Sequence, residues 1–164
     1  MNQKIVKIIS EQTETLFHNV NIMLMTCCLD AILYNQPIWK HVYHMLHSLD
    51  RWFINPDKYT EPLFHTPGLN SLDAPSENAL SREDLRAYCE GIRTKIFLYL
   101  ETLTDDLLTG TPEGCVYSRM ALILGQYRHT YAHLGTINAT TIGASGKWPR
   151  LVGLNSEATD ALWE

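Results

Sequence analysis

Several features that would assign a chain to a common functional class are missing from this sequence. Its longest apolar stretch, NIMLMTCCLDAILY, is interrupted by Asp30 and is shorter than the roughly 20 apolar residues that cross a bilayer. The 13 lysines and arginines form no basic stripe and the net charge is −5, so a nucleic-acid partner is not expected. The N-terminal MNQKIVKIISEQTE has no continuous apolar core and no small-residue cleavage site, unlike a signal peptide. We therefore expect a cytoplasmic protein that binds neither membranes nor nucleic acids.

Cysteine is also scarce, and its spacing fits neither a disulfide framework nor a zinc motif. The chain has four cysteines, at positions 27, 28, 89 and 115, and no C-x-x-C pair. Cys27 and Cys28 fall within a predicted helix, where adjacent side chains point about 100° apart, so they are not expected to pair. We expect free and mostly buried thiols.

The sequence does contain apolar residues at helical spacing along most of its length. Apolar residues make up 45% and charged residues 19% of the 164 positions, which indicates one folded domain over residues 1–164. The spacing predicts four helices, over about residues 4–34, 38–54, 81–103 and 117–141. The stretch SRED, which opens the third helix, resembles a capping box.

Residues 55–80 have a different character from the helices on either side. They contain four of the seven prolines and show no sustained apolar period, which predicts a long connection that packs over one end of the molecule. No segment is expected to form a sustained strand. The predicted fold class is therefore all-α, a four-helix bundle with a long connection between the second and third helices. Such bundles build metal sites from inward side chains on facing helices.

Two histidines one helical turn apart are the clearest candidates for chemistry. His129 and His133 in GQYRHTYAHLG are at i and i+4, so their side chains share a face about 6 Å apart and can reach one metal ion. The second helix offers His41, His44 and His47 as a third ligand. A helical wheel places His41 towards the polar side and does not choose between the other two. The alternative is that these histidines are hydrogen-bonded packing residues.

Two stretches resemble motifs of the DinB-like superfamily (DinB/YfiT-type metal-dependent bundles). HVYHMLHSLDRWF, residues 41–53, is similar to the second-helix motif, in which a ligand histidine precedes an aromatic pair by about two turns. GQYRHTYAHLGTIN, residues 125–138, is similar to the fourth-helix H-x-x-x-H-x-G motif. The predicted helix order and the place of the long connection also match, so the resemblance implies a DinB-like four-helix bundle.

The resemblance also implies a set of metal ligands. Carried over position by position, the ligands are His44, His129 and His133. His44 is preferred to His47 because the aromatic residues at 52 and 53 then fall at the aromatic positions of the family. Imidazole suits several divalent metals. We expect zinc or nickel, with iron as the alternative.

Three neutral imidazoles leave a divalent metal its full positive charge. Such a metal lowers the pKa of bound water, polarises a carbonyl or binds a thiol as thiolate. The resemblance implies relatives that transfer low-molecular-weight thiols. The expected function is therefore a metal-dependent transferase that uses a small thiol, or a hydrolase, acting on a small-molecule substrate. A homodimer is also expected, since such bundles often pair.

The residues around the histidines leave the reaction itself open. Gln126, one turn before His129, could orient water or substrate, and His47 and Asp50 are further candidates for contacts behind the ligands. No acidic residue lies between the paired histidines, unlike the zinc proteases, so peptide hydrolysis is not expected. The rival hypothesis is a non-enzymatic bundle, a ligand-binding, sensor or dimerisation module, whose histidine cluster is vestigial or structural.

Overall fold

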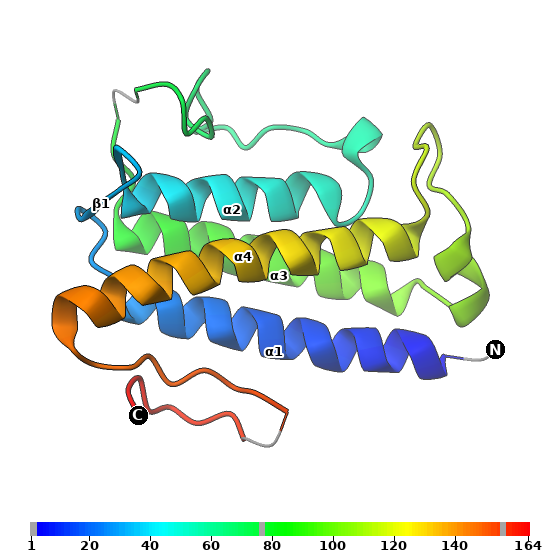
Figure 1. Ribbon diagram of the computed structural model, residues 1–164. Coiled ribbons are helices and arrows are strands. Elements are labelled where there is room, and N and C mark those ends of the chain that lie inside the picture. The colour runs from blue at the N-terminus through cyan, green and yellow to red at the C-terminus, as the bar shows by residue number, and fades with distance from the viewer. Residues whose placement is uncertain (1–2, 76–77, 155–156) are drawn as a thin grey trace.

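The structure, a computed structural model, describes residues 3–75, 78–154 and 157–164. Four long helices lie side by side within these residues (Figure 1). α1 and α2 each pack against both α3 and α4, and buried apolar side chains from all four form one core. The predicted all-α class is confirmed. The helices are α1 (Lys4–Thr26), α2 (Ile38–Trp52), α3 (Arg82–Glu101) and α4 (Arg119–Ser145).

Some expectations reach beyond what the structure describes. The single domain predicted over residues 1–164 includes residues 1–2, 76–77 and 155–156, which lie outside the described residues. Residues 76–77 also belong to the connection predicted over 55–80. Among the described helices, none combines the length and the apolar character that a membrane span requires.

The first helix is shorter than predicted. α1 ends at Thr26, and Cys27 follows it in extended backbone, with φ −71° and ψ 150°. The helix predicted to continue to residue 34 is therefore wrong, and the adjacent cysteines do not lie within a helix. All four cysteines are free, as predicted, but only Cys27 and Cys89 are buried, whereas Cys28 is exposed.

A small hairpin replaces the expected end of that helix. The strands β1 (Ile32–Leu33) and β2 (Gln36–Pro37) pair antiparallel. Tyr34 and Asn35 at the turn have φ of 48° and 64°, the positive values that a two-residue hairpin turn requires. The apolar residues of this segment continue the helical spacing, so periodicity alone could not reveal the turn.

The predicted start of the third helix is confirmed in atomic detail. The Ser81 side chain accepts a hydrogen bond from the backbone N–H of Asp84, and the Asp84 carboxylate accepts one from the backbone N–H of Ser81. These reciprocal bonds make a capping box. The fourth helix begins two residues later than predicted, after the capping residue Ser118, and continues four residues further, to Ser145. Gly146 follows it with a φ of 68°, which suits a residue without a side chain.

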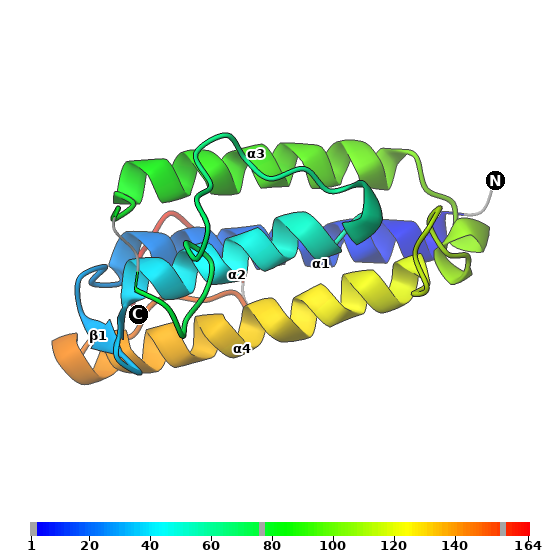
Figure 2. The same ribbon diagram turned by 90° about the horizontal axis from the view of Figure 1, so that it is seen from above.

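The connection between α2 and α3 runs back along α2 instead of covering one end of the molecule (Figures 1 and 2). Its Leu69 is buried in the core, and the Ala74 carbonyl accepts a hydrogen bond from the Lys40 ammonium. The hairpin adds a contact, since the Leu33 carbonyl lies 2.7 Å from His41 Nε2. Lys40 and His41 are consequently buried, which corrects the placement of His41 on a polar side of the helix.

Candidate metal centre

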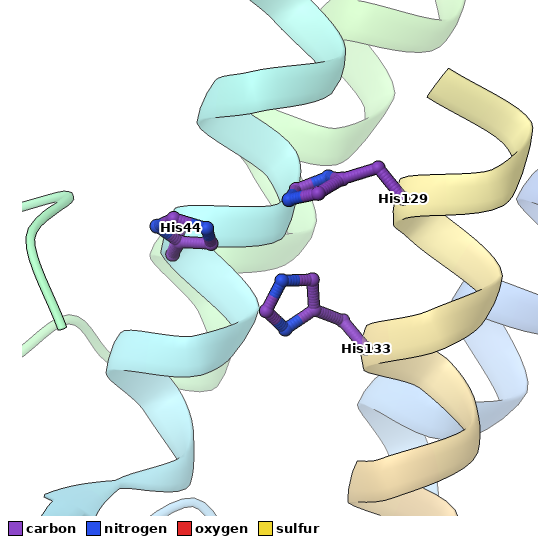
Figure 3. Close-up of side chains that lie close together, drawn as sticks. All are labelled: His44, His129 and His133. Atoms are coloured by element: carbon purple, nitrogen blue, oxygen red, sulfur yellow. The ribbon is translucent and has the colours of Figure 1, made fainter. Parts of the chain in front are cut away.

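The packing of α2 against α4 brings three histidines together (Figure 3). His44 comes from α2, and His129 and His133 come from successive turns of α4. Their ring centroids lie 4.6 to 5.4 Å apart, and one nitrogen atom from each lies within 4.8 Å of the others. We call these residues the three-histidine cluster, and this spacing could hold one metal ion.

The structure gives the histidines of α2 different directions. His44 lies against the two histidines of α4, whereas His47 lies against Glu61 and His65 of the connection. The wheel could not separate these two residues because both lie between the apolar core and the covering connection. The structure therefore places together the three residues that the resemblance implied, and their role as ligands stays a prediction.

Burial keeps the imidazoles of α4 neutral near pH 7. Burial lowers the pKa of His129 below its ordinary value, and a charge on His44 would lower it further. Burial, followed by the charges of His129, His44 and His41, lowers the pKa of His133 from 6.5 to about 4. Only a neutral imidazole can bind a metal, so both side chains are in the form that ligation needs.

The hydrogen bonds of the three-histidine cluster leave nitrogen atoms available for a metal. His44 Nδ1 lies 2.8 Å from the backbone carbonyl of Asn70. A carbonyl can only accept a hydrogen bond, so Nδ1 carries the proton and Nε2 keeps a free lone pair. Metal-binding histidines are oriented in this way by a carbonyl or carboxylate behind them.

One fully buried nitrogen of the cluster has no hydrogen-bond partner. His129 Nδ1 is buried and unpaired within the part of the chain that the structure describes. An unsatisfied buried nitrogen costs about 1–3 kcal/mol, so native structures rarely keep one without a reason. A metal ion that takes this nitrogen as a ligand gives such a reason. The donor set and this orphaned atom fit a metal centre.

The other predicted site residues, His47, Gln126 and Asp50, each contact different partners. His47 contacts the cluster through Asn70, whose side-chain amide lies 3.3 Å from His47 Nδ1. Gln126 is buried, and its carbonyl oxygen accepts a hydrogen bond of 3.3 Å from the Ser48 hydroxyl. Asp50 is paired with Lys95 and accepts a bond of 2.9 Å from the Tyr88 hydroxyl, so these partners lie on α3.

The partners of Asp50 predict a structural role that can be tested by Asp50→Asn. We expect this change to lower the free energy of unfolding by roughly 1–2 kcal/mol, because a nearly buried carboxylate loses its charge beside Lys95. Metal binding by the three-histidine cluster should be unchanged. Urea unfolding and a zinc titration measure the two effects, with the exposed Asp106→Asn as control. Weaker zinc binding without loss of stability would contradict this assignment.

The structure adds two residues that sequence reasoning did not select. Asn70 joins His44 to His47, and Glu61 Oε2 lies 2.6 Å from His47 Nε2. A chain of hydrogen bonds thus leads from the three-histidine cluster to a carboxylate. Asn70 carries no sequence signal, because its place in the connection depends on how the loop folds back over α2. Glu61 is followed four residues later by His65, but residues 55–80 have no helical period that would place these two side chains on one face.

Compared with models of protein families, with curated proteins and with solved structures, the chain shows no significant match to any of them. The assignment to the DinB-like superfamily therefore stays a prediction based on the two motifs. The functional argument has to come from the geometry of the described residues.

Proposed function

We propose that this protein is a DinB-like bundle that binds a divalent metal ion through His44, His129 and His133. The observation that carries the proposal is the convergence of three nitrogen atoms within 4.8 Å of one another from α2 and α4. The unpaired His129 Nδ1 and the neutral state of the α4 histidines support it. Three protein ligands are typical of catalytic sites, which leave a coordination position for water or substrate.

We further propose that the bound metal serves a transferase that uses a low-molecular-weight thiol, with hydrolysis as the second reaction class. A divalent metal at this site would supply positive charge that favours the thiolate form of a bound thiol. In the transfer, the thiol sulfur bonds to an electrophilic carbon of a small substrate, the bond to the leaving group breaks, and the thiol proton passes to the leaving group or to water. Zinc or nickel suits the imidazole ligands, with iron as the alternative.

Two residues of the connection, Asn70 and Glu61, would support the metal ligands. The Asn70 carbonyl holds the His44 ring by its Nδ1–H, which leaves the lone pair of Nε2 free for a metal. Glu61 lies at the far end of the hydrogen-bond path through His47 and Asn70. No carboxylate belongs to the three-histidine cluster within the described chain. A reaction that needs no strong base at the metal, such as thiol transfer, fits this arrangement better than peptide hydrolysis.

The non-enzymatic alternative is favoured by the position of one cavity. A cavity of about 530 Å³ lies between α1 and α3, lined by Glu14, Phe17 and Arg93 among others, and no member of the three-histidine cluster lines it. Under this alternative the bundle binds a metal or ligand without turnover, as a sensor or a dimerisation module. The two proposals share the metal and differ in whether a substrate reaches it.

An activity screen on metal-loaded protein separates these proposals. Zinc- and nickel-loaded protein is incubated with small thiols and electrophilic acceptors, and separately with activated esters. The proposed enzyme consumes thiol and acceptor in equal amounts, and both chelation and His129→Ala abolish the turnover. His18→Ala on α1 lies outside the cluster and should leave it unchanged. Full metal loading without turnover for either substrate class would favour the non-enzymatic bundle.

A further inference from the structure

A second group of metal-binding side chains lies on the same helix, facing the connection. His47 of α2 meets Glu61 and His65 of the connection, and one potential ligand atom of each lies within 4.8 Å of the others. Glu61 Oε2 lies 2.6 Å from His47 Nε2 and 3.8 Å from His65 Nδ1. We call these residues the loop cluster. None of them belongs to the three-histidine cluster.

We propose that the loop cluster is a second divalent-metal site, which fastens the connection to α2. Two imidazoles and one carboxylate are a ligand set that zinc uses in open sites, and cobalt and nickel accept the same donors. The site would join α2, at His47, to the part of the connection that carries Glu61 and His65, just after the short 3-10 helix Pro56–Lys58. The inference is independent of the proposed function, because it uses no ligand of the three-histidine cluster.

The surroundings give this site a protected interior and a route to solvent. The side chains of His47 and His65 are 4% and 13% exposed, whereas that of Glu61 is 44% exposed. A metal ion could therefore enter from the side of the carboxylate. The rings of His47 and His65 stack on each other, with centroids 4.9 Å apart.

The present hydrogen bonds show where the proton lies when no metal is bound. The Asn70 amide lies 3.3 Å from His47 Nδ1, and a donated amide hydrogen leaves the His47 proton on Nε2, which donates to Glu61. Burial lowers the pKa of His47 despite the opposing effect of Glu61, so the ring is neutral. A metal at Nε2 would require the proton on Nδ1. A half-turn of the Asn70 amide then presents its oxygen to Nδ1–H, which is the support typical of metal-bound histidines.

One neighbour competes with the metal for His65. The Tyr43 hydroxyl lies 2.8 Å from His65 Nδ1, the nitrogen nearest to Glu61. Burial raises the pKa of Tyr43, so the phenol keeps its proton and can donate it to this nitrogen. Ligation through Nδ1 requires that bond to break. Removing the hydroxyl by Tyr43→Phe should therefore strengthen metal binding by the loop cluster. If the cluster is held only by hydrogen bonds and binds no metal, Tyr43→Phe would not increase metal binding.

The test counts bound metal in proteins that lack either cluster. Zinc bound after equilibrium dialysis is measured by elemental mass spectrometry for the full chain and for His129→Ala/His133→Ala. Each is also measured with Glu61→Gln/His65→Gln added, and Glu113→Gln on another loop serves as the matched control. We expect the loop-cluster changes to remove about one ion per chain from either parent, and the control to remove none. Equal metal content with and without Glu61→Gln/His65→Gln would overturn the proposal.

A spectroscopic measurement covers the case in which the combined variants fold poorly. Cobalt(II) is titrated into His129→Ala/His133→Ala, which keeps the loop cluster intact, and the visible d–d absorption is followed. Saturable bands that strengthen in Tyr43→Phe and vanish in Glu61→Gln support the second site. Absence of such bands in the protein with an intact loop cluster would overturn it. Because this protein lacks two ligands of the three-histidine cluster, failure here and failure of the proposed function are distinguishable.

Discussion

Replacing His129 and His133 together by alanine is expected to lower the affinity of the three-histidine cluster for zinc at least about a thousandfold. Structural zinc sites with four ligands bind with about 10–16 kcal/mol, or roughly 2.5–4 kcal/mol for each ligand. Loss of two ligands therefore costs about 5 kcal/mol or more, and each 1.4 kcal/mol is about tenfold in affinity. Both rings contact His44 in the structure, so their removal leaves that residue as the one remaining member.

Competition with a chromophoric chelator measures this loss, because the chelator reports free zinc over a wide range of affinity. His18→Ala is the matched control, since it removes an imidazole from α1 that belongs to neither cluster. The loop cluster is intact in both variants and contributes equally to each titration. If His129→Ala/His133→Ala and His18→Ala bound zinc with the same affinities and the same number of ions, the histidines of α4 would be packing residues.

The second large effect concerns stability, because the metal would join α2 to α4. A ligand that binds only the folded state stabilises it by RT ln(1 + [L]/Kd), about 2.7 kcal/mol at a hundredfold excess over Kd. For a chain of this length, about 1 kcal/mol corresponds to roughly 2–4 °C in Tm. Removing zinc with a chelator is therefore expected to lower Tm by about 5–11 °C.

The variant without the α4 histidines separates this effect from any action of the chelator on the rest of the protein. Thermal unfolding is followed by circular dichroism with zinc and with chelator, for the unchanged chain and for His129→Ala/His133→Ala. The shift caused by the chelator should be clearly smaller in the variant, where only the loop cluster can still respond. Equal shifts in the two proteins would show that the three-histidine cluster does not stabilise the fold through a metal.

Local sequence patterns were sufficient to predict most of the helices. The apolar spacing of α2 and α3 and the serine and aspartate of the capping box act within a few residues of one another, so a single chain reveals them. The end of α1 was mispredicted because the apolar residues after Thr26 continue the helical spacing, although the chain there forms a hairpin. The turn of this hairpin requires a positive φ at Tyr34. Neither the spacing of apolar residues nor the composition predicts a positive φ at a tyrosine.

The candidate site was predictable where its geometry is local and unpredictable where it depends on folding over a distance. The one-turn spacing of His129 and His133 places both on one face of α4. The contribution of Asn70 could not be foreseen, because it requires the connection to lie along α2 and offer both a carbonyl and an amide there. The same covering segment also buries Lys40, whose ammonium donates to the Ala74 carbonyl, and the helical pattern of the sequence does not indicate this contact.

The most direct test of a metal centre between α2 and α4 is the metal content of the protein as cells make it. The chain, produced without a histidine tag, and His129→Ala/His133→Ala are purified side by side and analysed by elemental mass spectrometry. The account predicts that the unchanged chain carries about one more divalent metal ion per chain than the variant, whatever the loop cluster holds. Equal metal content in the two proteins, also after reconstitution with zinc, nickel and iron, would contradict it.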